Sequence, residues 1–223
     1  MNKNLWMIVI GVVVVGVTIY LLSGNHYKAN APTVAAFDPL NATYVVNDSS
    51  IVLMDGRAQA PAAPGSAEQT VTKIFGQPAA GDLNGDGTAD AALIITQNSG
   101  GSGTFYYVAA AINTASGTAG TNAMLLGDRI APQNIAIQNG QIVVNYADRN
   151  PGEPMTTAPS VAVTKYFLVN GVTLEAASPV AGAGEHCGGN MTTAATCATG
   201  YHCAPTPGSH LPFGDVGGTC VAN

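Results

Sequence analysis

The chain has 223 residues, of which 9% are charged, and its formal net charge is −6. An ordinary soluble domain is about 25% charged, so the low value favours an exported, β-rich protein over a cytoplasmic enzyme. Its 7 lysine and arginine residues form no basic patch, and we therefore expect no nucleic-acid partner.

The first predicted element is a charge-free apolar segment at residues 5–22. Its 18 residues come near the thickness of a bilayer core, which is about 30 Å at about 1.5 Å of helix rise per residue. Trp6 and Tyr20 lie near its ends, where aromatic rings favour the membrane interface. We expect residues 1–24 to be a transmembrane anchor or an uncleaved signal. The alternative is cleavage after Ala31, which would give a secreted protein.

After a spacer at residues 25–36, short apolar runs separated by turn residues fill residues 37–176. These runs are rich in Val, Ile, Tyr and Phe, which is typical of β-strands. The expected fold class is mainly β, with an antiparallel domain that is either a sandwich or a curled sheet. One short helix could begin at residues 66–73, because Ser66 can cap it and Glu68 lies in its first turn. Strands are expected at residues 43–46, 50–54, 71–75, 91–96, 105–112, 123–126, 134–137, 141–146 and 161–169.

An acidic loop at residues 82–90 (DLNGDGTAD) carries oxygen-bearing side chains at alternate positions. A calcium ion needs several oxygens that converge on one point, and Gly87 permits a sharp turn that brings them together. An EF-hand is not expected, because its last ligand position is Leu93 instead of Glu. The alternative to a metal site is a metal-free turn, in which the clustered carboxylates would repel one another. The predicted calcium ligands are the side chains of Asp82, Asn84, Asp86 and Asp90 and the backbone carbonyl of Thr88.

This loop resembles the D-x-[DN]-x-D-G-x-x-D loops of integrin-α FG-GAP repeats and of related VCBS modules in secreted bacterial proteins. Wider stretches, such as GDLNGDG and VVNYADRNPGEPM, look like a group of uncharacterised bacterial exported proteins. The resemblance implies a structural calcium ion and an extracytoplasmic location, and it brings no known activity. Because the motif occurs once, we do not expect a propeller of repeated motifs.

All four cysteines lie in a separate C-terminal module at residues 185–223, beyond a small-residue linker at residues 177–184. An even, clustered set beyond an export signal indicates two disulfides in an oxidising compartment. We therefore expect the C-terminal bulk to be extracytoplasmic, in the periplasm or at the cell surface. A zinc site is the alternative, and the sequence has no C-x2-C pair to support it.

Four cysteines allow three pairings, and their spacing alone does not choose among them. The tail CGGN…TC-x2-GYHC…GGTCV resembles small cysteine-rich modules that are appended to secreted proteins. Analogy with such interlocked modules implies the pairs Cys187–Cys203 and Cys197–Cys220.

The expected role is binding or surface structure, with a cell-envelope polysaccharide or protein as partner and membrane contact through residues 5–22. The hydrolase motifs G-x-S-x-G and H-E-x-x-H are absent from the sequence. An alternative is a hydrolase of a cell-envelope polymer that uses the acid–base pairs at residues 128–129 and 148–149, together with Glu153. The same arginines could instead tie strand ends to nearby carboxylates.

A further alternative is a peptidase inhibitor that acts through the loop between Cys203 and Cys220. Pro205, Pro207 and the disulfide framework would lower the entropy cost of ordering this loop.

Overall fold

The computed structural model describes residues 36–189, 194–205 and 217–223, all within the compact unit Val34–Asn223. These residues form antiparallel β-sheets, apart from one parallel pairing of two-residue strands. The expected mainly β fold class is therefore confirmed. The described residues contain no helix that is long and apolar enough to cross a membrane. The predicted anchor at residues 1–24 lies outside them.

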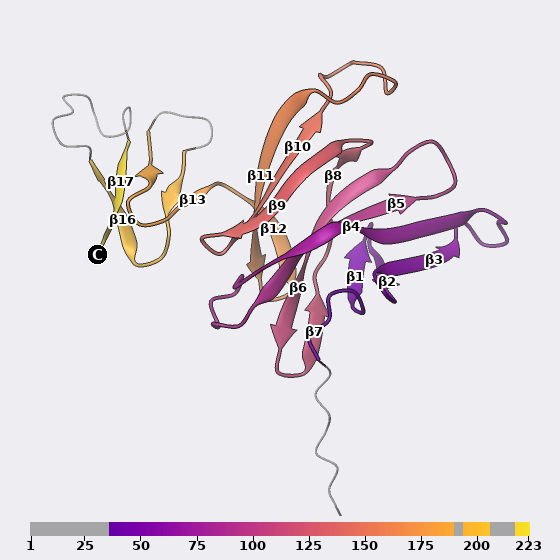
Figure 1. Ribbon diagram of the computed structural model, residues 1–223, viewed down its shortest axis with the longest axis horizontal. Helices are drawn as coiled ribbons and strands as arrows, with labels where there is room; N and C mark the ends of the chain where they lie inside the picture. Colours follow the sequence, from indigo (N-terminus) through magenta and orange to yellow (C-terminus); the bar gives the residue numbers. More distant parts are fainter. Residues whose placement is uncertain (1–35, 190–193, 206–216) are drawn as a thin grey trace, which may run out of the picture. The chain divides into compact units, whose positions relative to one another are not determined.

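A six-stranded sheet has the order β3-β4-β5-β6-β7, and β8 also pairs with β6 (Figure 1). Its middle strands, β5 and β6, are buried on both faces because their sequences are nearly continuous apolar runs. The strands of this sheet are β3 (Arg57–Pro61), β4 (Gln69–Gly81), β5 (Asp90–Asn98), β6 (Phe105–Thr114), β7 (Gly117–Gly120) and β8 (Met124–Asp128).

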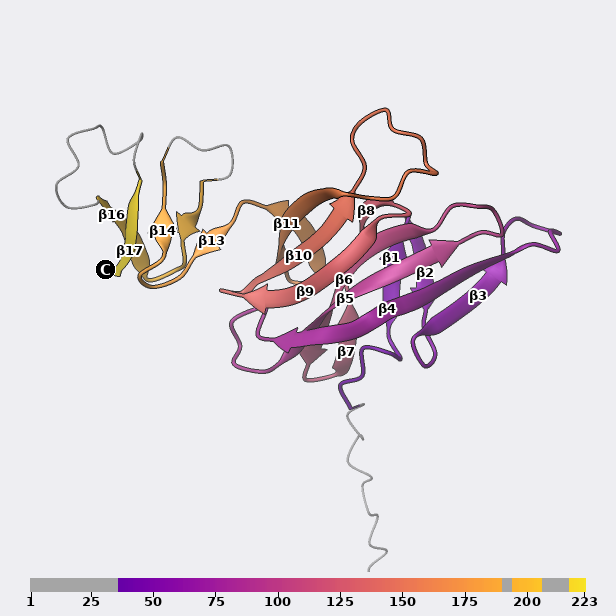
Figure 2. The same ribbon diagram turned by 45° about the horizontal axis from the view of Figure 1, so that its top comes forward.

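A four-stranded sheet with the order β12-β11-β10-β9 packs on one face of these middle strands (Figure 2). Ile94 and Val108 of the central sheet share a buried cluster with Val144 and Phe167 of the covering sheet. Alternate residues of each strand point to this cluster, as the two-residue period of a strand requires. The four strands are β9 (Ala131–Gln138), β10 (Gln141–Asp148), β11 (Val161–Asn170) and β12 (Thr173–Ala177).

A hairpin of β1 (Thr43–Val46) and β2 (Ser49–Val52) covers the opposite face of β5 and β6. Tyr44 is fully buried there, in a cluster with Leu93 and Tyr107. A Cβ atom on Gly120 would lie 2.2 Å from the backbone oxygen of Thr43. Glycine at this position therefore allows β7 to approach the hairpin closely.

The two larger sheets curl toward each other, so the open choice between a sandwich and a curled sheet is resolved in favour of curled sheets (Figures 1 and 2). Strand β9 lies beside β4 without pairing to it. A Cβ atom on Gly81 of β4 would lie 2.9 Å from a methyl carbon of Ile137 on β9. The absence of a side chain at Gly81 thus permits this close approach.

The expected short helix at residues 66–73 is wrong. Ser66 Oγ accepts a hydrogen bond from the N–H of Glu68 at 3.0 Å within a tight turn, and β4 begins at Gln69. The residues that follow are mostly β-branched and pair with both β3 and β5, so strand pairing overrides the local capping signal. Strands β3, β7 and β12 are not among the expected strands before residue 177, because they are short or rich in small residues.

The C-terminal module contains a three-stranded antiparallel sheet with the order β14-β17-β16 and a short parallel pair, β13-β15. The predicted linker at residues 177–184 carries β13 and so contributes to the module. The five strands are β13 (Val180–Ala181), β14 (His186–Cys187), β15 (Thr196–Cys197), β16 (Tyr201–Pro205) and β17 (Gly218–Ala222).

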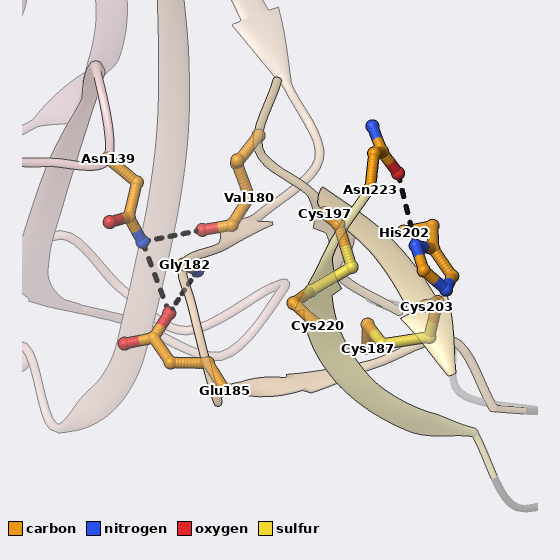
Figure 3. Close-up of a disulfide and its surroundings, with 10 residues drawn as sticks. All are labelled: Asn139, Val180, Gly182, Glu185, Cys187, Cys197, His202, Cys203, Cys220 and Asn223. Atoms are coloured by element: carbon orange, nitrogen blue, oxygen red, sulfur yellow. Dashed lines mark hydrogen bonds between the residues drawn. A yellow bond between two sulfur atoms is a disulfide. The ribbon is translucent and has the colours of Figure 1, made fainter. Parts of the chain in front are cut away.

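Two amide side chains, one in the turn between β9 and β10 and one at the start of β10, hold this linker segment in place. Gln141 is 1% exposed. Its Nε2 donates to the backbone oxygen of Ser178 at 2.8 Å, and its Oε1 accepts from the N–H of Val180 at 2.6 Å. Asn139 Nδ2 donates to the backbone oxygen of Val180 at 3.0 Å and to Glu185 Oε2 at 3.1 Å (Figure 3). The buried glutamine therefore satisfies backbone groups that would otherwise lack partners.

Replacing Gln141 with leucine is expected to lower the free energy of unfolding by about 1–3 kcal/mol, because the side chain gives up two hydrogen bonds, those to the backbone oxygen of Ser178 and the N–H of Val180. Urea denaturation of the full chain in zwitterionic micelles measures this loss. Gln138→Leu is the matched control, since Gln138 is exposed on the neighbouring strand, and it should change stability by less than about 0.5 kcal/mol. Equal effects of the two substitutions would contradict the role of Gln141.

Candidate functional site

The predicted calcium loop joins β4 to β5 and projects from the end of the hairpin that they form. Leu83 is buried and packs into the main core, and it anchors one end of the loop. Asn84 and Asp86 are exposed. Gly85 and Gly87 have φ values of +78° and +81°, and a Cβ atom on either would meet nothing within 4 Å. Glycine is favoured here by backbone conformation and not by lack of space.

Backbone and side-chain donors surround the carboxylates of this loop. Asp82 Oδ1 accepts the N–H groups of Asn84 (3.2 Å) and Gly85 (2.7 Å), and Asp82 Oδ2 accepts the N–H of Gly87 at 2.9 Å. Asp86 Oδ1 accepts the hydroxyl of Thr88 at 2.6 Å and its N–H at 2.7 Å. The amide of Asn84 donates to Asp86 Oδ2 at 2.9 Å. These bonds fold the acidic side chains back over their own loop.

The same hydrogen bonds explain the acidity of Asp86. The hydroxyl of Thr88 contributes most, followed by the N–H of Thr88 and the amide of Asn84, and together they hold the pKa of Asp86 below its ordinary value. Asp86 therefore stays ionised at pH values where an ordinary aspartate begins to take up a proton.

Asp90 is placed differently from the other predicted ligands, because it is fully buried at the start of β5. Its Oδ2 accepts the N–H of Leu83 at 2.9 Å, and its Oδ1 accepts the N–H of Asn113 on β6 at 2.8 Å. It thereby joins the loop to the neighbouring strand. One sequence signal could have indicated this burial, since Asp90 directly precedes the continuous apolar run of β5.

The carboxylates of the loop differ in burial, since Asp90 is buried and Asp86 is exposed. Within the part of the chain that the structure describes, Asp82, Asp86 and Asp90 do not bring one carboxylate oxygen each within 4.8 Å of both of the others. Two ligands of one calcium ion lie at most about 5 Å apart, because each Ca–O distance is about 2.3–2.6 Å. One ion would therefore contact all three carboxylates only after a movement of the loop.

The acid–base pairs at residues 128–129 and 148–149 lie at the ends of β8 and β10, and they tie backbone segments together. Arg129 bonds the carboxylate of its neighbour Asp128 through Nε at 3.1 Å and Nη2 at 2.9 Å. Arg149 donates to the backbone oxygens of Asp128, Arg129 and Thr157. Asp148 Oδ1 accepts the N–H of Arg149 at 2.8 Å. The observed contacts therefore agree with the alternative in which these arginines tie strand ends together.

Glu153 is likewise engaged within its own turn. It accepts the N–H of Asn150 at 2.8 Å and its side-chain amide at 2.9 Å. These bonds, the side-chain amide first, keep the pKa of Glu153 below its ordinary value, and the positive charge of Arg149 adds a smaller effect. A lowered pKa is the opposite of what a general acid at neutral pH requires.

The cysteine module is held by disulfides Cys187–Cys203 and Cys197–Cys220 (Figure 3). The pairing implied by analogy with interlocked modules is confirmed. The sulfur atoms of Cys187, Cys197 and Cys203 lie within 4.8 Å of one another, and all three are oxidised in disulfides, so none is a free thiolate that could bind a metal. His202 Nδ1 lies 3.0 Å from Asn223 Oδ1. Residues 206–216, which form most of the predicted inhibitor loop, lie outside the described residues.

Comparison with known proteins gives no relative: no family model, no curated protein and no solved structure matches this chain.

Proposed function

We propose that this protein is a membrane-anchored, extracytoplasmic β-protein with a binding or surface-structural role, in which the loop at residues 82–90 binds calcium. The observation that supports its location most strongly is the pair of disulfide bonds, since disulfides persist in oxidising compartments and are rare in the cytoplasm. Binding is favoured over hydrolysis because the side chains of Asp128, Arg149 and Glu153 are engaged in hydrogen bonds to backbone groups.

The location is tested by treating intact bacterial cells, or cells whose outer membrane has been opened, with a protease that cannot cross the inner membrane. Residues 37–223 should become accessible while a tag on the amino terminus stays protected. The four cysteines should also resist a thiol-specific reagent until they are reduced. Free thiols together with a protected C-terminal region would overturn the proposed location.

Calcium is proposed to be held by the side-chain oxygens of Asp82, Asn84 and Asp86 and the backbone carbonyl of Thr88, with water completing its shell. Support comes from the all-oxygen donor set and from the exposed, glycine-shaped backbone of the loop. Two carboxylates and an incomplete protein shell favour a weak site, with a dissociation constant of about 10⁻⁴–10⁻³ M, as in extracellular calcium modules. Such an ion would stabilise the end of the β4–β5 hairpin.

Calcium at about ten times its dissociation constant is expected to stabilise the full chain by about 1.4 kcal/mol. This corresponds to a rise in Tm of about 3–6 °C for a chain of this size. Differential scanning calorimetry in micelles, with calcium and with a chelator, measures the shift. Asp86→Ala should abolish it, whereas Glu175→Ala, which removes an exposed acid on β12, should preserve it. The calcium proposal fails if the wild-type Tm does not respond or if Asp86→Ala keeps the full response.

A further inference from the structure

A seam runs between β4 and β9, where the two larger sheets meet along unpaired strand edges (Figure 2). Strand β9 is the last strand of its sheet, and the pairing of β4 with β3 ends at Lys73. The seam is closed at one end by the contact of Gly81 with Ile137. At the other end, between Phe75 and Pro132, it opens into a hollow of about 180 Å³.

Both edges are irregular at the level of this hollow. On β4 the register shifts between Phe75 and Ala79, so that three residues of β4, among them Pro78, face one residue of β5. On β9 the register against β10 shifts around Gln133, next to Pro132. Bulges and prolines disrupt the regular row of N–H groups that an added β-strand would need. The hollow therefore suits a compact ligand better than an extended peptide.

The floor and one wall of the hollow are apolar and fixed in place. Ile94 forms part of the floor and is 3% exposed. Phe75 is 40% exposed. Its ring is held edge-to-face by Tyr106, with the ring centroids 5.4 Å apart and the planes at 79°. A fixed, exposed aromatic ring offers apolar contact at little further cost in conformational entropy.

The remaining rim carries amide side chains. Gln77, Gln133 and Asn134 are exposed. None of their amide groups makes a hydrogen bond to another described residue of the chain. A primary amide both donates and accepts hydrogen bonds, as a hydroxyl group does. The described residues that line the hollow are all uncharged, so the site offers no partner for a phosphate, a carboxylate or an ammonium group.

We propose that this hollow, which we name the seam site, binds one neutral sugar ring of a cell-envelope polysaccharide. The apolar C–H face of the ring lies against Phe75, and its hydroxyl groups meet the amides of Gln77, Gln133 and Asn134. The volume is below the range of about 300–1,000 Å³ that is typical of sites for drug-sized ligands, so the seam site holds a single ring of a longer chain. This proposal deepens, and rests on, the binding role proposed above.

The test uses the full chain in micelles of a zwitterionic detergent, because detergents with sugar headgroups would compete for the site. Neutral oligosaccharides of glucose, mannose and N-acetylglucosamine serve as probes, with oligogalacturonate as the charged comparison. Saturation-transfer NMR detects binding and calorimetric titration measures its dissociation constant. We expect at least one neutral probe to bind and oligogalacturonate not to bind.

Phe75→Ala is expected to weaken that binding about tenfold or more, which is a loss of about 1.4 kcal/mol or more. Phe105→Ala is the matched control, because Phe105 is 41% exposed on a strand and lies outside the seam site, and it should leave binding unchanged. Gln77→Ala should weaken binding severalfold without affecting the fold, since the amide of Gln77 has no partner among the described residues, and it stays informative if Phe75→Ala unfolds.

Three results would overturn the seam site: no neutral probe binds at about 10 mM, only the charged probe binds, or the Phe75 and Gln77 variants bind as the wild type does. None of these results affects the tests of calcium binding and of cellular location, since neither test involves residues of the seam. Failure of the seam site is therefore distinguishable from failure of the proposed function.

Discussion

Asp90→Asn is expected to lower the free energy of unfolding by about 2–4 kcal/mol, both with calcium and with a chelator. The buried carboxylate accepts two backbone N–H groups, those of Leu83 and Asn113. Asparagine has almost the same shape but offers one acceptor oxygen, so its NH₂ group would face the second N–H. One buried donor would be left without a partner and would face a like dipole, which accounts for the size of the loss. Chemical denaturation of the full chain in the two conditions measures it.

This experiment also separates the two roles that Asp90 could have. A calcium ligand would show little loss in chelator, and its replacement would remove the stabilisation by calcium. If Asp90 is only structural, its variant would lose stability in both conditions and would still be stabilised by calcium. Asp86→Asn is the matched control, because Asp86 is exposed in the same loop and should cost little stability in chelator while it weakens the response to calcium. The reverse pattern would show that Asp90 is a ligand and Asp86 is not.

Removing the disulfide Cys197–Cys220 with a double serine substitution is expected to destabilise the C-terminal module by about 3 kcal/mol. The buried cluster of this module consists of Ala181, Cys187 and Cys220, so half-cystines make up most of its core. A module of this size cannot hold itself by apolar burial alone. The β-domain, which comprises residues 37–176, has two buried hydrophobic clusters that contain no cysteine. We therefore expect the β-domain to keep its own unfolding transition.

Limited proteolysis followed by mass spectrometry measures this effect. New cleavage sites should appear within residues 185–223 of the variant, and the β-domain should remain resistant. Wild-type protein treated with a reducing agent should show the same cleavage sites. A module that stays resistant after reduction would show that the disulfides are dispensable for its fold.

Much of the β-domain is predictable from local sequence. The apolar runs of β5 and β6 contain β-branched and aromatic residues that favour strands, and their predicted positions agree with the structure to within about two residues. Short strands such as β7 (GTAG) carry no such signal. They become strands because β6 presents an unpaired edge to them, and this pairing is a property of the fold and not of their own residues.

The acidic loop shows the same division within one site. The spacing of oxygen-bearing residues along 82–90 is visible in the sequence, but the burial of Asp90 is not, since Asn84 and Asp86 of the same pattern are exposed. Asp90 is buried at the start of β5, where β6 presents the partly buried N–H of Asn113 to its carboxylate. The need for that partner arises from a residue 23 positions away in the sequence.

By itself the sequence determined the β-rich class, the acidic loop and the presence of four clustered cysteines, because strand propensity, turn chemistry and composition are local properties. Only the tertiary structure decided that Asp90 points inward, that the sheets curl, and that unpaired edges of β4 and β9 enclose the seam site. Each of these features depends on groups far apart in the chain. Their positions follow from backbone hydrogen bonding and close packing of the whole domain, which local residue patterns do not encode.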